Sequence, residues 1–186
     1  MFMFVLRRPR LFIMECIPRS DEYSEGDVLY KFLKMTDPKD IAVKEFTTKT
    51  KFLAHLRRKR SLERFNFIHL SGHGDPKHCA FELPFGWVGP EEFPDSCFEG
   101  KRVAFSACGL SRRDFIEPFI DATGAKAVIA PRKEVRYDDA TIWYLTYYYL
   151  MLHHRFTSVG AFDRVNDTLC YGPRRGRVKG GFEHWS

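Results

Sequence analysis

Short apolar runs alternate with longer amphipathic stretches along most of this chain. The apolar runs cover residues 11–16, 41–46, 65–71, 103–107 and 125–130. Apolar side chains at helical spacing fill the stretches between and after them, at residues 24–35, 48–62, 112–123, 138–154 and 158–169. Strands that alternate with helices are typical of βα units around a parallel sheet. We therefore expect an α/β fold whose mostly parallel central sheet is flanked by helices.

Two of the predicted helices have a clear inward face. The inward side chains are Val28, Leu29, Phe32 and Leu33 in the first helix and Phe52, Leu53 and Leu56 in the second. The helix predicted at 138–154 is different, because aromatic residues lie on every side of it between Trp143 and Tyr149. We expect that helix to be buried on most sides, or to provide the surface for a partner.

The length of the chain, 186 residues, is enough for one domain with a sizeable core and too small for two ordinary domains. We assign residues 1–170 to that domain and residues 171–186 to a basic, glycine-rich C-terminal tail. Five cysteines without a C-x-x-C pair are typical of a reduced cytosolic protein. The apolar run at 1–6 is too short for a signal peptide, and no apolar stretch reaches a transmembrane length. A soluble, cytoplasmic protein without membrane association is expected.

The formal net charge is +6, and much of the excess lies in basic runs at 57–60 and 174–179. Such runs can form an electrostatic footprint for nucleic acid or for an acidic partner. They can equally be a solvated helix end and an exposed tail, since cationic side chains interact favourably with the C-terminus of a helix. The second interpretation is the simpler one, so nucleic acid is not expected as the main partner.

A histidine and a cysteine follow two of the predicted strands. His73 stands between Gly72 and Gly74 after the strand at 65–71, and Cys108 follows the strand at 103–107. Parallel sheets place ligands at the carboxyl ends of their strands, so both side chains are expected at one edge. A nucleophilic thiol needs a base, donors for an oxyanion and exposure. Either residue alone would be ordinary, but together they indicate a catalytic pair.

Three segments resemble caspase-like cysteine peptidases. The segments IHLSGHG at 68–74 and VAFSAC at 103–108 are similar to the two catalytic strand ends of that family. The segment GAKAVIA at 124–130, followed by DDAT at 138–141, is similar to the CHAT branch, which is related to separases and caspases. The similarity covers residues 65–152. The chain departs from caspases in lacking a glutamine before the Ala-Cys pair and in its shorter His-to-Cys spacing.

This resemblance implies a caspase-like three-layer sandwich that acts as a cysteine endopeptidase. His73 would be the base and Cys108 the nucleophile, and the backbone N–H groups of Gly74 and Cys108 would hold the oxyanion. The enzyme would cleave a protein or peptide substrate without a metal or other cofactor. A stress, defence or cell-death type pathway, with a regulatory protein partner, is the expected setting.

Three further residues are expected to bind the substrate, and they also have simpler interpretations. These are Ser106, Asp138 and Asp139, of which the two aspartates would favour a basic residue at P1. Asp138 can instead be the N-cap of the helix at 138–154. His69 shares a strand face with His73, so it either orients that base or packs in the core. No third member of a catalytic triad is evident.

Other hypotheses compete with the peptidase. A metal site from His73, His78 and Cys79 is disfavoured, because the spacing and the fourth ligand of a zinc site are lacking. The same fold could be a catalytically idle pseudoenzyme that acts as a binding module, or a basic nucleic-acid-binding module.

The irregular stretch 75–100 is rich in Pro, Gly and aromatic residues, and a hairpin is expected around 79–87. It directly follows the histidine, and its aromatic residues are Phe81, Phe85, Trp87 and Phe93. We expect this stretch to be a lid that a partner or ligand orders.

Overall fold

The computed structural model of the chain describes residues 9–18, 20–21, 23–36, 40–75, 77–84, 86–169 and 181–186. Its central feature is a six-stranded sheet with the order β2-β1-β3-β7-β8-β9. These strands are β1 (Leu11–Glu15), β2 (Ile41–Glu45), β3 (Phe67–Ser71), β7 (Arg102–Ser106), β8 (Ala127–Pro131) and β9 (Phe182–Trp185). All neighbouring pairs are parallel except β8 and β9. The prediction of a mostly parallel sheet is confirmed.

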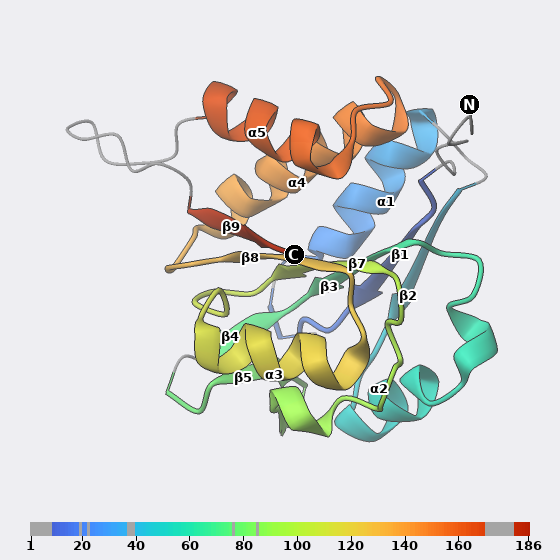
Figure 1. Cartoon of the computed structure of the whole chain (residues 1–186). Coiled ribbons are helices and arrows are strands. Elements are labelled where there is room, and N and C mark those ends of the chain that lie inside the picture. Colours follow the sequence, from blue (N-terminus) through green and yellow to red (C-terminus); the bar gives the residue numbers. More distant parts are fainter. Residues whose placement is uncertain are drawn as a thin grey trace.

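Helices cover both faces of this sheet (Figure 1). One face carries α1 (Glu25–Thr36), α4 (Tyr137–Leu152) and α5 (Ser158–Thr168). The other carries α2 (Lys49–Leu56) and α3 (Arg113–Thr123), together with a small antiparallel sheet. Its strands are β4 (His73–Asp75), β5 (Ala80–Leu83) and β6 (Gly86–Val88). Short 3-10 helices occur at η1 (Lys59–Ser61) and η2 (Pro90–Glu92). The expected flanking of the sheet by helices is also confirmed.

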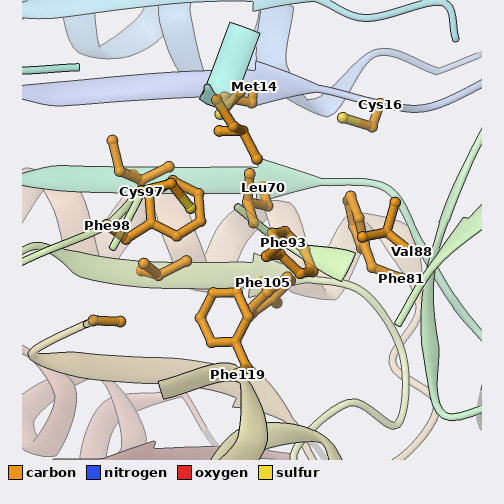
Figure 2. Packing of buried hydrophobic residues seen from close by; sticks show 14 of the residues in the cluster. Met14, Cys16, Leu70, Phe81, Val88, Phe93, Cys97, Phe98, Phe105 and Phe119 are labelled. Atoms are coloured by element: carbon orange, nitrogen blue, oxygen red, sulfur yellow. The ribbon is translucent and has the colours of Figure 1, made fainter. Parts of the chain in front are cut away.

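Phenylalanine side chains fill the layer between the main sheet and α3 (Figure 2). Phe105 of β7 lies at the centre, with ring centroids 5.5 Å from Phe81, 5.0 Å from Phe119 and 6.3 Å from Phe93. All four side chains are at most 1 % exposed. Because aromatic pairs at these separations add to the burial of apolar area, this cluster anchors the strand that leads to Cys108.

The aromatic helix α4 packs on the opposite face. Trp143, Tyr144, Tyr147 and Tyr148 are all buried, whereas Ile142 is 48 % exposed. The Tyr144 hydroxyl donates to the carbonyl oxygen of Phe105 at 2.7 Å. Burial on most sides, which the aromatic sequence predicts, is confirmed for this helix.

Helix α1 turns a narrower face inward than its sequence predicts. Leu29 and Leu33 are fully buried, as expected, but Val28 is 47 % and Phe32 is 41 % exposed. Residues four apart lie on one line along a helix, and this line begins at the buried Glu25. The inward face of α1 therefore consists of Glu25, Leu29 and Leu33. The expectation that Val28 and Phe32 also face inward was wrong.

Helix α2 begins as predicted and ends six residues early, at Leu56 instead of Leu62. The Thr48 side chain caps its start by accepting from the N–H of Lys51 at 3.2 Å. At its end, the Ser61 hydroxyl bonds the carbonyl oxygens of His55 and Arg58, at 3.1 and 2.7 Å. The same two carbonyl oxygens accept from the backbone N–H groups of Arg58 and Ser61, so a tight turn replaces the helix here.

The stretch 75–100 is part of the core. The hairpin expected around 79–87 is present as β5 and β6. Phe81, Phe93 and Phe98 are each at most 1 % exposed, and Trp87 stacks on His78 at 4.8 Å. Phe85 lies outside the described residues. Lids come from regions with few buried apolar contacts, whereas buried aromatic rings anchor this stretch. The expectation of a lid over all of 75–100 was therefore wrong.

The C-terminal residues return to the sheet, so the tail predicted at 171–186 is too long. Residues 182–185 form β9, and the Phe182 ring stacks on Trp143 at 4.3 Å. The Trp185 indole N–H donates to the Ser111 hydroxyl at 2.9 Å. The basic run 174–179 lies outside the described residues. Within the described part of the chain, no helix has the length and apolar character needed to cross a membrane.

Candidate active site

The carboxyl ends of β3 and β7 lie side by side in the sheet. Their last paired residues are Ser71 and Ser106. The Gly72 N–H donates to the Ser106 carbonyl oxygen at 3.2 Å, so the pairing extends one residue beyond β3. His73 and Cys108 follow these serines at the same offset. The structure therefore brings the histidine and the cysteine to neighbouring strand ends at one edge of the sheet.

Gly74 brings the backbone next to His73 onto the backbone of Cys108. A Cβ atom at Gly74 would lie 1.9 Å from the Cys108 carbonyl oxygen and 3.1 Å from its backbone nitrogen. No side chain fits there, so this glycine is needed for the close approach of two backbones. The two residues whose N–H groups are expected to hold an oxyanion are thus in contact.

The thiol of Cys108 lies against the loop between β8 and α4. Its Sγ atom accepts from the Val135 N–H at 3.4 Å and donates to the Val135 carbonyl oxygen at 3.5 Å. The cysteine is half-buried. Burial raises the pKa of the thiols of Cys16, Cys79 and Cys97, which disfavours their reactive thiolate forms.

His73 has a carboxylate partner. Its Nε2 atom lies 2.7 Å from Oδ2 of Asp21, and the two side chains are 45 % and 34 % exposed. An acceptor at Nε2 favours the tautomer in which that nitrogen carries the proton, which leaves Nδ1 free to accept one. The contact therefore favours the tautomer that a candidate general base would use.

Asp21 is a candidate functional residue that sequence reasoning missed. It lies in the polar turn after β1, and β1 pairs directly with β3. Polar residues after adjacent parallel strands gather at the same edge of a sheet, so the polar turn after β1 could have indicated a partner for His73. It depended on the strand order, however, which the periodicity of the sequence does not determine.

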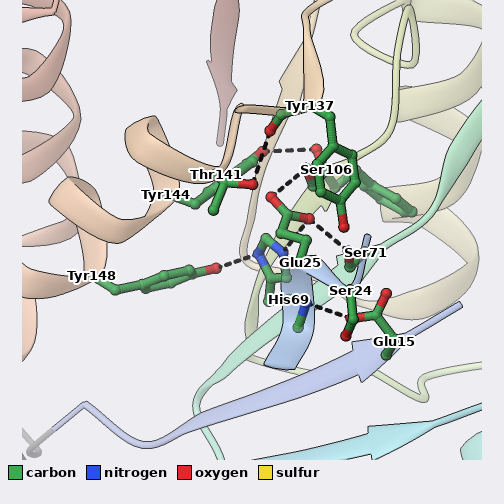
Figure 3. Close-up of polar contacts among 12 residues, drawn as sticks. Glu15, Ser24, Glu25, His69, Ser71, Ser106, Tyr137, Thr141, Tyr144 and Tyr148 are labelled. Atoms are coloured by element: carbon green, nitrogen blue, oxygen red, sulfur yellow. Dashed lines mark hydrogen bonds and ion pairs between the residues drawn. The ribbon is translucent and has the colours of Figure 1, made fainter. Parts of the chain in front are cut away.

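A buried polar network lies beneath the two strand ends (Figure 3). Its centre is Glu25, the first residue of α1, which is 1 % exposed. The Ser71 hydroxyl donates to Glu25 Oε2 at 2.6 Å and the Ser106 hydroxyl donates to Oε1 at 2.8 Å. His69 Nε2 lies 3.4 Å from Oε2. One carboxylate thus links the ends of both strands that lead to the candidate catalytic residues.

Two predicted site residues belong to this network. The Ser106 hydroxyl donates to Glu25 and is buried, which disfavours the predicted contact of Ser106 with substrate. His69 is fully buried, its Nδ1 lies 3.0 Å from the Tyr148 hydroxyl, and its ring packs edge-on against Tyr144. Of its two interpretations, core packing is the one that these contacts favour.

Asp138 and Asp139 lie at the start of α4, and neither is the N-cap. That position is Arg136, whose guanidinium pairs with Asp138 at 2.9 Å. Hydrogen bonding to Arg136 lowers the pKa of the Asp138 carboxyl, which is 62 % exposed. Asp138 also accepts from the Asp139 N–H at 3.1 Å. The cation beside Asp138 makes it a weak partner for a basic substrate side chain.

A second group of carboxylates lines a cavity of about 440 Å³ beside Asp21. The charged residues around it are Glu15, Asp21, Asp27, Glu45 and Lys44. The Lys44 ammonium lies 3.2 Å from Nδ1 of His55, a residue that does not line the cavity. Asp27 is paired with the Lys31 ammonium at 2.6 Å, but carboxylates still outnumber cations around this space, which adjoins the carboxylate partner of His73.

Glu15 is the most deeply buried of these carboxylates. It is 5 % exposed, and its Oε2 atom accepts from the Gly26 N–H and from the Ser24 hydroxyl. Its Oε1 atom is buried without a hydrogen-bond partner among the described residues. Burial, followed by the nearby Glu25, raises the pKa of Glu15 to about 7.

No group of three His, Cys, Asp or Glu side chains in the described part of the chain is arranged to hold a metal ion. Comparison of the sequence with models of protein families finds no match. Comparison with curated proteins finds none either.

Proposed function

We propose that this chain is a cysteine endopeptidase of the caspase-like type, in which Cys108 is the nucleophile and His73 the base. One observation carries the proposal: both residues follow in-register ends of adjacent parallel strands, and Gly74 packs directly on Cys108. The six-stranded sheet between two helical layers supports a caspase-like sandwich. The half-buried thiol, unlike the thiols in the core, has room to meet a substrate.

The reaction is acyl transfer to sulfur followed by hydrolysis. His73 takes the proton of the Cys108 thiol at Nδ1 while Asp21 holds its Nε2–H. The sulfur attacks the scissile carbonyl carbon, and the N–H groups of Gly74 and Cys108 bind the oxyanion. His73 then protonates the leaving amine, so that the C–N bond breaks and a thioester remains. Water, deprotonated by His73, hydrolyses the thioester and restores the thiol.

The preferred substrate has an arginine or a lysine at P1. Asp138 and Asp139 suggested this preference, and the carboxylate-lined cavity beside Asp21 supports it better. That cavity adjoins the catalytic base, and carboxylates predominate among its charged lining residues. A long cationic side chain complements this lining, whereas an acidic side chain would be repelled.

The decisive experiment combines thiol labelling with peptide cleavage by the full chain. An electrophilic peptide ending in arginine should label wild-type protein at Cys108, and His73→Ala should abolish the labelling. Cys108→Ala and His73→Ala should also abolish cleavage while circular dichroism shows an intact fold. If either variant retains near-normal turnover, the assignment of the catalytic pair is wrong.

A catalytically idle binding module is the second candidate, and the contact between Cys108 and Val135 favours it. In this structure the thiol bonds to the backbone of a neighbouring loop. A module of this kind would bind a peptide without cleaving it, and its Cys108 would label no faster than an ordinary thiol. The regulatory protein partner remains a prediction for either candidate.

A further inference from the structure

The position of Glu25 is unusual for a charged residue. It is 1 % exposed and lies between helix α1 and the sheet, where water does not solvate its carboxylate. Burial of a charge is unfavourable unless other groups replace its hydration. An apolar side chain would fill the same space at lower cost, so packing alone does not explain a glutamate here.

The hydrogen-bond donors around Glu25 come from the two strands that lead to the candidate catalytic residues. Ser71 ends β3 and bonds Oε2, and Ser106 ends β7 and bonds Oε1. The two serines are paired in register, so each carboxylate oxygen holds one of two neighbouring strand ends. A carboxylate can do this because both of its oxygens accept.

Further contacts restrain the network from the other side. His69 of β3 approaches Glu25 through Nε2 and the Tyr148 hydroxyl through Nδ1. The neighbouring Tyr144 bonds the Phe105 carbonyl oxygen, directly before Ser106. Helices α1 and α4 thus both hold β3 and β7 through polar contacts just below the site.

We propose that Glu25 is a positioning residue that sets the separation of His73 and Cys108. The proposal rests on the proposed peptidase function. Beyond each serine the chain continues only two residues to the reacting group, so a shift of either strand end moves the base relative to the thiol. The reaction is sensitive to such shifts, since a displacement of about 1 Å can lower a rate about 100-fold.

The test measures the rate of Cys108 alkylation by iodoacetamide against pH, together with cleavage of an arginine peptide. Wild-type Cys108 should be alkylated faster than the same thiol in the His73→Ala variant, because the imidazole accepts its proton. Glu25→Gln keeps the size of the side chain and replaces one acceptor by an amide donor. We expect its alkylation rate at about pH 6, and its kcat/KM, to fall about 10- to 100-fold with little change in KM.

The serines provide a second set of variants. These variants test the positioning role of the Glu25 network even if Glu25→Gln does not fold. Ser71→Ala and Ser106→Ala should each lower the rate of alkylation, and the double variant should lower it by less than the product of the two effects. Tyr147→Phe is the matched control, because it removes a buried hydrogen bond to Ser158 in the same helical layer without touching either strand end. It should leave the pH profile unchanged.

The outcomes separate the two proposals. If wild type shows reactivity that depends on His73 and the Glu25 and serine variants retain it within about twofold, positioning by Glu25 is refuted and the peptidase stands. If the Tyr147→Phe control changes the profile as much as these variants do, the effect is general destabilisation and positioning is again refuted. If wild-type Cys108 itself behaves as an ordinary thiol, both proposals fail.

Discussion

The Nε2 atom of His73 and the Oδ2 atom of Asp21 lie 2.7 Å apart, although the residues belong to opposite ends of the β1-α1-β2-α2-β3 segment. In the proposed peptidase, this contact orients a histidine of a glycine-rich turn as the base. It also links the base to the carboxylate-lined cavity, because Asp21 lines that cavity. The following predictions depend on these relationships.

Asp21→Asn should lower kcat for peptide cleavage by about tenfold or more, since an asparagine no longer favours one tautomer of His73. The loss should be smaller than that of His73→Ala because the pair is partly exposed to water. Steady-state kinetics measures both variants. An Asp21→Asn variant with wild-type kcat would show that the carboxylate has no part in catalysis.

Removing negative charge from the cavity should weaken the preference for basic peptides. We expect the Glu15→Gln, Glu45→Gln double variant to lose about tenfold in kcat/KM for an arginine peptide relative to its leucine analogue. Asp138→Asn is the matched control, and it should keep the preference because Arg136 already pairs with Asp138. Strict selection for aspartate at P1 in a peptide library would contradict both the preference for basic residues and the role of the cavity in it.

Glu15 should make the protein less stable as the pH rises. Its pKa is about 7 in the fold against 4.5 ordinarily, so its contribution to stability is complete below about pH 4.5. That contribution is lost as the pH rises through about 7, and its full size is about 3 kcal/mol. Glu15→Gln should therefore stabilise the protein at pH 8 by about 1–3 kcal/mol relative to its effect at pH 4.5.

Urea unfolding at the two pH values measures this difference. A Glu15→Gln variant whose effect on the free energy of unfolding is the same at both pH values would show that Glu15 does not titrate in this range.

Gly74→Ala should abolish most peptide cleavage, since its Cβ atom would overlap the Cys108 carbonyl oxygen. We expect at least a 100-fold fall in kcat/KM as the two backbones separate. Gly100→Ala is the control: its φ is +67°, with nothing within 4 Å of the added Cβ, so it should cost about 1–2 kcal/mol of stability with normal activity. Equal losses of activity in both variants would argue against a specific contact at Gly74.

Local patterns in the sequence determined the type and order of most elements. Apolar runs and helical spacing predicted β1, β2, β3, β7 and β8, because apolar strands and amphipathic helices leave local signals in the sequence. The glycine after α3 marked its end, and Gly124 indeed adopts a left-handed conformation with φ of 68°. Turn residues after two strands also identified His73 and Cys108 as neighbours at the edge of the sheet.

Only the tertiary structure decided which polar groups meet. The partnership of His73 with Asp21, and of Glu25 with Ser71 and Ser106, depends on β3 lying between β1 and β7. Strand order of this kind is set by long-range packing, which leaves no local period in the sequence. The same reason explains why β9 was taken for a tail and why the aromatic stretch 75–100 was taken for a lid. Their apolar side chains are buried by partners distant in the chain, such as Trp143 against Phe182 and Phe105 against Phe81.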